Sequence, residues 1–300
     1  MSAVHPNPAH PNPALRALGL ADDDRVVIVH ADDVGMCHAT IPAAVELLQT
    51  GLVTSVSVMA PCPWARAAVD ALAEVPGADL GVHWTVTAEW PSYRWPSLTR
   101  AAELDDADRF LPRTNEEVRA AAPAPVVAAE LERQLDSVLA WEAPLSHVDS
   151  HMGAIATPAY LPAAVEIALA RGVLPMFPRF DADGWRSTGL DGEAAGLAAA
   201  YSAHLEERGL PMVDHLRSLP LHDPDDQPAL LRTMIDELPP GITHLYAHPA
   251  LDTPELRAAT TDWPSRVANL EALRDPGVIE HVRRSGVRLV GYDALQALLP

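Results

Sequence analysis

Residues 25–35 read RVVIVHADDVG, a run of β-branched residues that passes directly into two adjacent carboxylates. This pattern predicts a buried strand with a polar end. Similar apolar runs follow at 54–59, 80–86, 145–148, 173–177, 243–246 and 287–290. Most are separated by Ala-, Leu- and Glu-rich segments with helical spacing, at 41–49, 65–72, 126–140, 160–170, 196–207, 229–237 and 267–273. Strands that alternate with helices predict βαβ units and a parallel sheet.

About seven strands without an interdomain linker favour a single α/β domain over residues 21–300, in the form of a distorted, incomplete (β/α) barrel. A doubly wound open sheet is the alternative. The start of the chain differs, because HPNPA occurs twice, at 5–9 and 10–14. Proline at this density blocks helix and ladder hydrogen bonds, so residues 1–20 are expected to form a disordered, Pro-rich tail.

Composition excludes several classes of protein. The 300 residues are 48% hydrophobic and 21% charged, which is typical of a folded, soluble chain. The net charge of −20 argues against nucleic acid and anionic membranes as partners. All 21 basic residues are arginine, which excludes Schiff-base lysines, lysine nucleophiles and the P-loop lysine.

The chain has two cysteines, Cys37 and Cys62, and no CxxC pair. Two isolated thiols are typical of a reducing compartment, and no basic segment followed by an apolar core marks a signal peptide. We therefore predict a cytoplasmic location. The sequence does not determine the oligomeric state, for which a homodimer is our working assumption.

Polar residues lie on or directly after several predicted strands, toward the end where parallel α/β folds place their chemistry. They include Asp32, Asp33, His83, His151 and His248. Individually, Asp33 is also a suitable helix N-cap, and each histidine could be a hydrogen-bonded core residue. Together, Asp33, His83 and His151 supply one carboxylate and two imidazoles from different strands, which suits Zn²⁺, Mn²⁺, Fe²⁺ or Co²⁺ in an open, catalytic site.

Other catalytic fingerprints are missing. The sequence contains no GxG pair for a dinucleotide loop and no GxSxG elbow, and neither cysteine lies in a nucleophile motif. Water activated by a metal is therefore favoured over covalent catalysis.

Four motifs in order, ADDVGM at 31–36, GVH at 81–83, DSH at 149–151 and AHP at 247–249, resemble the YdjC/ChbG (HpnK-related) carbohydrate deacetylase family. The resemblance extends from Arg25 to Leu298. The family usually has Asn-Ala-Asp-Asp-Phe-Gly where this chain has His30 and Val34 around the aspartates, and Ala250 replaces a glycine. None of these changes removes a titratable group.

The resemblance implies a polysaccharide-deacetylase-like barrel that removes an N-acetyl group from an amino sugar. It implies that Asp33, His83 and His151 hold one divalent metal, with Asp32 as general base and His248 as general acid. Mg²⁺ follows from the family, whereas two histidine ligands suit Zn²⁺ or another transition metal better. Asp149, beside this set, is a candidate for contacting substrate or for orienting a metal ligand, with a structural role as a cap of its loop as the alternative.

Substrate contacts are predicted in the loop 84–95, which holds three of the seven tryptophans. The candidates are Trp84, Trp90, Tyr93, Arg94 and Trp95, because aromatic rings stack on sugar rings and arginine binds hydroxyls or carboxylates. A loop pinned to the barrel rim by buried tryptophans is the alternative. Arg179 is a further candidate, with an ion pair to an acidic neighbour as its alternative.

We therefore expect a metal-dependent carbohydrate N-deacetylase acting on an amino sugar or a short, chitooligosaccharide-type chain. Another barrel metallohydrolase, such as a phosphoesterase or an amidohydrolase, is the first alternative. A sugar-binding protein without catalysis is the second. The sequence does not specify the sugar, its chain length or its linkage.

Overall fold

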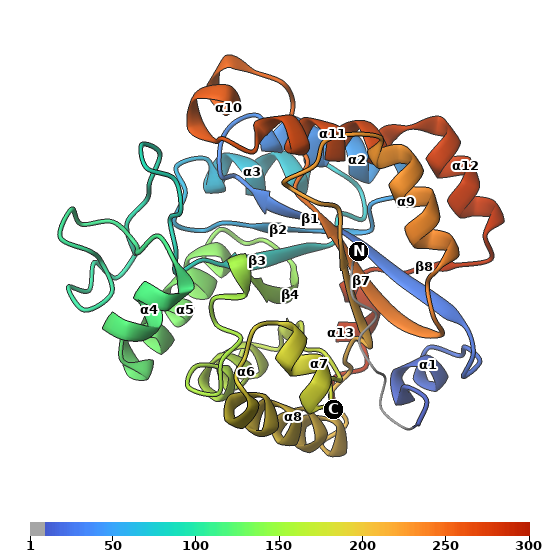
Figure 1. The fold of residues 1–300 in the computed structure, drawn as a ribbon, viewed down its shortest axis with the longest axis horizontal. Coiled ribbons are helices and arrows are strands. Elements are labelled where there is room, and N and C mark those ends of the chain that lie inside the picture. The colour runs from blue at the N-terminus through green and yellow to red at the C-terminus, as the bar shows by residue number, and fades with distance from the viewer. Residues whose placement is uncertain (1–9) are drawn as a thin grey trace.

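The computed structural model describes residues 10–300 and is built around a curled parallel sheet (Figure 1). The strands follow the order β5-β4-β3-β2-β1-β7-β6, and β8 pairs with β1 beside this path. Their bounds are β1 (Arg25–Val34), β2 (Ser55–Val58), β3 (Leu80–Trp84), β4 (Leu145–Ser150), β5 (Leu174–Pro175), β6 (His215–Ser218), β7 (Gly241–Ala247) and β8 (Arg288–Leu289).

Helices cover the outside of the sheet. Figure 1 shows α2, α3, α9, α11 and α12 on one side and α6, α7 and α8 on the opposite side. The helices are α1 (Pro13–Ala17), α2 (Thr40–Thr50), α3 (Ala65–Ala73), α4 (Asn115–Ala121), α5 (Ala124–Leu139), α6 (Leu161–Leu169), α7 (Ala182–Ser187), α8 (Gly192–Glu207), α9 (Gln227–Asp236), α10 (Pro254–Ala259), α11 (Trp263–Arg274), α12 (Pro276–Arg284) and α13 (Tyr292–Gln296). A 3₁₀ turn, η1 (His151–Gly153), follows β4.

The predicted fold class, an incomplete parallel barrel with a path of seven strands, is confirmed. Its membership differs from the prediction, because β6 was missed and β8 lies off the main path. The edges β5 and β6 approach each other through an isolated parallel bridge between Pro178 and Val213. The barrel is therefore strongly curled and joined at this edge by little backbone pairing.

The folded part of the chain begins closer to the N-terminus than the sequence predicted. Residues 1–9 of the expected tail lie outside the described residues. Asn12 caps α1 by accepting a hydrogen bond from the Ala14 backbone N–H, and its side-chain amide donates to Asp214 at 2.8 Å. Leu15 is fully buried. The folded region therefore begins by residue 12, not after residue 20, because this short helix finds tertiary partners.

Two further features of the fold concern its cysteines and its helices. Cys37 and Cys62 are buried free thiols. None of the helices within residues 10–300 combines the length and the apolar character that a membrane span requires.

Candidate active site

The end of β1 directs two consecutive aspartates into the same cavity. Successive strand residues normally point to opposite faces, but the pairing of β1 with β2 shifts register between Ala31 and Val34. Asp33 has a φ of 61°, a left-handed conformation that is uncommon outside glycine. As a result, Asp32 and Asp33 both line the cavity. Backbone strain of this kind is often found at functional sites.

Gly35 allows this irregular strand end to pack closely. Its φ is 83°, and a Cβ atom built there would lie 2.9 Å from the Cα atom of Ala65 on α3. Any larger residue would have to move the helix backbone. The glycine of the ADDVG motif therefore serves backbone packing behind the two carboxylates.

Asp33, His83 and His151 form a buried cluster at the carboxyl ends of three strands. Asp33 Oδ1 lies 3.3 Å from His83 Nε2 and 3.1 Å from His151 Nδ1. One candidate ligand atom from each residue falls within 4.8 Å of the others. The structure thus brings together the three residues that the sequence predicted as metal ligands.

Additional side chains hold this cluster in place. Asp149 Oδ1 lies 2.8 Å from His83 Nδ1, which leaves His83 Nε2 facing Asp33, and Ser57 Oγ donates to Asp149 Oδ2 at 3.1 Å. Carboxylates that orient a ligating imidazole in this way are common around protein metals. The position of Asp149 favours the role of orienting His83 among the roles considered for it.

The electrostatics of the cluster favour a cation. Burial opposes ionisation of Asp33, but the charges of His151 and Arg266 hold its pKa well below the usual range. Burial also disfavours a charged His151, yet Glu89 and Asp33 raise its pKa to about 9. The carboxylates therefore attract positive charge, either as protons on the histidines or as a metal ion that replaces them.

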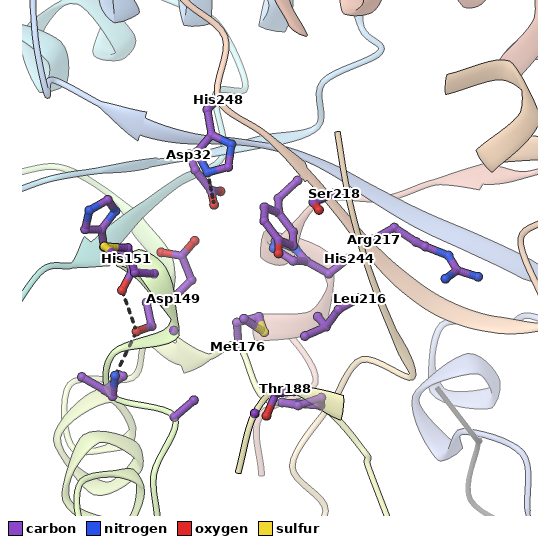
Figure 2. Close-up of a pocket in the computed structure, with 18 of the residues that line it drawn as sticks. Asp32, Asp149, His151, Met176, Thr188, Leu216, Arg217, Ser218, His244 and His248 are labelled. Carbon is purple, nitrogen blue, oxygen red and sulfur yellow. Dashed lines mark hydrogen bonds and ion pairs between the residues drawn. The ribbon is translucent and has the colours of Figure 1, made fainter. Parts of the chain in front are cut away.

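Asp32 and His248 form a second pair beside the cluster. His248 Nε2 lies 3.8 Å from Asp32 Oδ2, and Figure 2 shows the two side chains facing each other. Asp32 Oδ1 contacts His30 Nδ1 at 2.6 Å. His248 Nδ1 is buried without a hydrogen-bond partner in the part of the chain that the structure describes. Burial lowers the pKa of His248, although Asp33 and Asp32 oppose this effect.

A cavity of about 1390 Å³ opens from these residues. Asp32, Asp149, His151 and His248 occupy one side of it, and Met176, Thr188 and Leu216 lie across from them (Figure 2). The volume exceeds the roughly 300–1,000 Å³ of most small-molecule pockets. The cavity therefore has room for more than a single small ligand group.

Most side chains of the aromatic loop 84–95 do not line this cavity. Trp84 lines the cavity, although it is buried and its indole N–H donates to the Leu131 carbonyl at 2.9 Å. Trp90, Tyr93, Arg94 and Trp95 are not among the lining residues. Trp90 packs under the Arg266 guanidinium, 5.4 Å from the ring centroid.

The other three side chains of this loop have partners within the fold. The indole N–H of Trp95 donates to the Thr87 carbonyl at 3.0 Å, and Arg94 donates to Asp106 at 2.6 Å. The Tyr93 hydroxyl donates to the Met36 carbonyl. The geometry therefore favours the pinned-loop alternative over direct substrate contact for Trp90, Tyr93, Arg94 and Trp95.

Arg179 also lies apart from the cavity lining. It is almost completely buried and pairs with Asp214 at 2.6 Å and Glu206 at 2.5 Å. These contacts connect the segment after β5 to the start of β6 and to α8. The ion-pair alternative describes Arg179 better than a substrate contact does.

Two residues of the site were not predicted from the sequence. Glu89 lies 3.0 Å from His151 Nε2, and Arg266 Nη1 donates to Asp33 Oδ2 at 2.8 Å. Glu89 could have been noticed as an acid within the aromatic loop. Arg266 lies on a helix remote in sequence, where no local pattern distinguishes it from the other arginines.

The fold and the site define a (β/α)-barrel protein with a candidate metal centre at the carboxyl ends of its strands. More particularly, the chain belongs to the YdjC-like protein family, whose profile matches residues 26–284. A carbohydrate deacetylase of Thermus thermophilus is 34% identical over 268 residues, covering 88% of this chain and 91% of that protein. A chitooligosaccharide deacetylase of Enterobacter sp. is 26% identical, covering 90% and 98%.

A solved structure confirms the architecture. It belongs to a protein of Enterococcus faecalis that is named for cellobiose-phosphate cleavage. The TM-score is 0.74, and the match covers 91% of this chain and 99% of that protein. At 18% identity the likeness concerns the fold alone.

Proposed function

We propose that this protein is a metal-dependent carbohydrate deacetylase that hydrolyses the acetamide of an N-acetylated amino sugar. The observation that carries this proposal is the Asp33–His83–His151 cluster beside the Asp32–His248 pair, in one large cavity. Membership of the YdjC-like family and similarity to named carbohydrate deacetylases support it.

The donor set suits a divalent ion held by Asp33, His83 and His151. Their ligand atoms are buried and mutually close, and Asp149 already orients His83. Such an ion would polarise the acetamide carbonyl and lower the pKa of water. We propose Zn²⁺ as the ion, because two imidazoles suit a transition metal, with Mg²⁺ as the alternative from the family resemblance.

The residues around the cluster supply the proton transfers. Asp32 Oδ2, which lies 3.8 Å from His248 Nε2, takes a proton from the attacking water. The C–N bond then breaks, and His248 gives a proton to the departing amine, so that acetate and the free amino sugar result. Because His248 is neutral over much of the neutral pH range, it must bind this proton before it can act as an acid.

The size of the cavity bears on the substrate. A volume of about 1390 Å³ accommodates an amino sugar together with neighbouring residues of a short oligosaccharide. We therefore propose N-acetylated oligosaccharides of the chitooligosaccharide type as substrates. The cytoplasm remains the proposed location, and a homodimer the proposed assembly.

Release of acetate tests the proposal directly. Protein loaded with Zn²⁺ or Mg²⁺ is incubated with GlcNAc and short chitooligosaccharides, beside a chelator-treated sample, Asp32→Asn and the exposed variant Asp70→Asn. We expect acetate only with metal, normal rates for Asp70→Asn, and a roughly 10²–10⁴-fold loss for Asp32→Asn. Equal rates for the two variants would remove Asp32 as the base. Tight metal binding without acetate from any sugar would point to another hydrolase activity.

A further inference from the structure

A chain of buried polar side chains leads away from Asp32 through the barrel interior. His30 on β1 lies 2.6 Å from Asp32 Oδ1 through Nδ1, and 2.8 Å from His147 Nε2 through Nε2. His147 Nδ1 lies 2.7 Å from Ser146 Oγ, which also contacts Asp79 Oδ1. Ser146 and Asp79 stand at the amino ends of β4 and β3, so the chain crosses the barrel from the candidate site to its opposite end.

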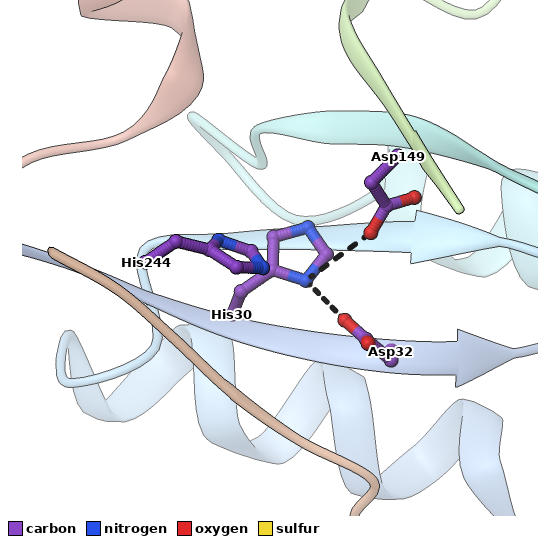
Figure 3. A group of neighbouring side chains, drawn as sticks. All are labelled: His30, Asp32, Asp149 and His244. Atoms are coloured by element: carbon purple, nitrogen blue, oxygen red, sulfur yellow. Dashed lines mark hydrogen bonds and ion pairs between the residues drawn. The ribbon is translucent and has the colours of Figure 1, made fainter. Parts of the chain in front are cut away.

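The contact between His30 and Asp32 is a hydrogen bond and does not bridge a metal. His30, Asp32, Asp149 and His244 lie close enough to resemble a second cation site (Figure 3). However, ligand atoms each about 2.0–2.2 Å from a zinc ion normally stand further apart than the 2.6 Å between His30 and Asp32. The geometry therefore favours a shared proton between these two residues.

Two glycines make room for the chain. A Cβ atom at Gly81 would lie 2.4 Å from His147 Nε2, and one at Gly291 would lie 2.5 Å from Asp79 Oδ2. Any other residue at Gly81 would displace the imidazole from its contact with His30. The absence of a side chain at Gly81 and Gly291 thus leaves the space that His147 and Asp79 occupy.

With His30 and His147 both neutral, this series of side chains can be hydrogen-bonded throughout in only two directions. A charged His30, which would donate from both ring nitrogens, gives a third arrangement, with the proton of His147 on Nδ1. A neutral imidazole carries one N–H, so the Nε2–Nε2 contact requires opposite tautomers in His30 and His147. If Asp32 accepts from His30 Nδ1–H, then His147 must donate from Nε2 and accept at Nδ1. Ser146 must then donate to His147, and only a protonated Asp79 can donate to Ser146. In the other direction Asp32 itself would carry the proton.

We propose that Asp79 acts in its protonated form, as a donor to Ser146, and that Ser146, His147 and His30 are positioning residues. They transmit this donor direction and present a fixed N–H to Asp32 Oδ1. This inference rests on the proposed function, because a general base must be ionised. Asp32 Oδ2, the oxygen that faces His248, is then the atom left free to take the proton from water.

The environment of the chain agrees with this direction. Burial raises the pKa of Asp79 to about 6, so the carboxyl keeps its proton up to about that pH. Burial lowers the pKa of His147 well below its usual value, so its ring is neutral. Tyr292 stacks on His147 with ring centroids 4.1 Å apart and donates no proton to it, since its hydroxyl pairs with His244 Nδ1 at 2.9 Å.

Histidine tautomers provide a test that does not depend on activity. Zn²⁺-loaded protein labelled with ¹⁵N-histidine is examined by NMR just below the pKa of about 6 of Asp79. We expect His30 to carry its proton on Nδ1 and His147 on Nε2. Asp79→Asn should keep both tautomers at higher pH as well, because an amide N–H replaces the carboxyl O–H. A proton on Nδ1 of His147 would overturn the proposal.

Kinetics show whether the chain positions Asp32. Ser146→Ala should lower kcat about tenfold with little change in KM, the effect of losing one hydrogen bond. Ser55→Ala is the matched control, because Ser55 is equally buried on β2 and its hydroxyl has no partner within residues 10–300. Equal kcat values for the two variants would overturn the positioning role. If Asp32→Asn were fully active, the proposed function would fail while the tautomers could still be as expected.

Discussion

Arg266 on α11 donates a hydrogen bond to Asp33 at the end of β1, across 233 positions of the chain. Both side chains are only 1% exposed, and the donor occupies Asp33 Oδ2 while Oδ1 faces the two histidines. Asp33 therefore has a single oxygen available to a metal. The same ion pair ties the candidate site to a helix that packs outside the sheet.

Removing this arginine should destabilise the protein most when no metal is bound. Arg266→Met leaves Asp33 buried without its partner, at an expected cost of about 3 kcal/mol in the free energy of unfolding. A bound cation would compensate part of that charge, so the loss should shrink with metal. Urea denaturation with and without chelator measures both values. Arg208→Met, at an exposed pair with Glu166, is the control and should have little effect. Equal losses for the two variants would contradict this prediction.

Metal affinity should fall further when a candidate ligand is replaced than when a residue that orients a ligand is replaced. His151→Ala removes a candidate ligand and should abolish stoichiometric binding after dialysis. Asp149→Asn only weakens the orientation of His83, so affinity should fall roughly 10–100-fold. His281→Ala, near the exposed Asp236, is the control and should bind normally. Unchanged stoichiometry in His151→Ala, determined by elemental analysis, would break the proposed ligand set.

The sequence predicted the barrel because several of its strands contain β-branched or apolar runs. The run 26–29 of β1 is Val-Val-Ile-Val and is buried on both faces, and such a run is easily detected. In contrast, β6 was missed, since its buried positions are His215 and Arg217. Such residues are tolerated inside only when tertiary partners exist, and a single segment does not reveal those partners.

Residues of the site were predictable from the sequence where they lie close to the ends of strands. Asp33 and His83 lie near the ends of β1 and β3, and His151 directly follows β4, so topology alone brings them together. Glu89 lies on a loop and Arg266 on an outer helix, and the sequence does not predict where such segments place their side chains relative to the strands. The aromatic loop was ambiguous for a related reason, because composition does not tell whether a tryptophan faces a cavity or the core.

The acid role of His248 makes a prediction about pH. Burial lowers the pKa of this imidazole below its usual 6.5. If the protonated form is required in the free enzyme, kcat/KM falls as pH rises through that lowered pKa, so the alkaline limb begins below pH 6.5. His248→Ala should lose this limb and roughly 10²–10⁴-fold in kcat, whereas His281→Ala should keep both. An alkaline limb that survives in His248→Ala would assign it to another group.

Asp79 should make the stability of the fold depend on pH. Its pKa is raised from 3.8 to about 6, chiefly by burial, and hydrogen bonds to the ionised form from Ser146 and from the Asp293 backbone N–H limit the rise. A carboxyl group with a raised pKa stabilises the folded state fully below its unfolded pKa, and this contribution is lost as pH rises through the folded pKa. From about pH 4 to pH 8 the loss amounts to about 3 kcal/mol.

Asp79→Asn removes this ionisation and keeps a donor for Ser146. Its free energy of unfolding should therefore match that of the wild type near pH 4 and exceed it by up to about 3 kcal/mol near pH 8. Urea denaturation across this range measures the difference. Asp23→Asn, at an exposed aspartate, controls for the change in net charge. If Asp79→Asn were less stable than the wild type near pH 8, Asp79 would be an ionised acceptor, and Ser146 would point away from His147.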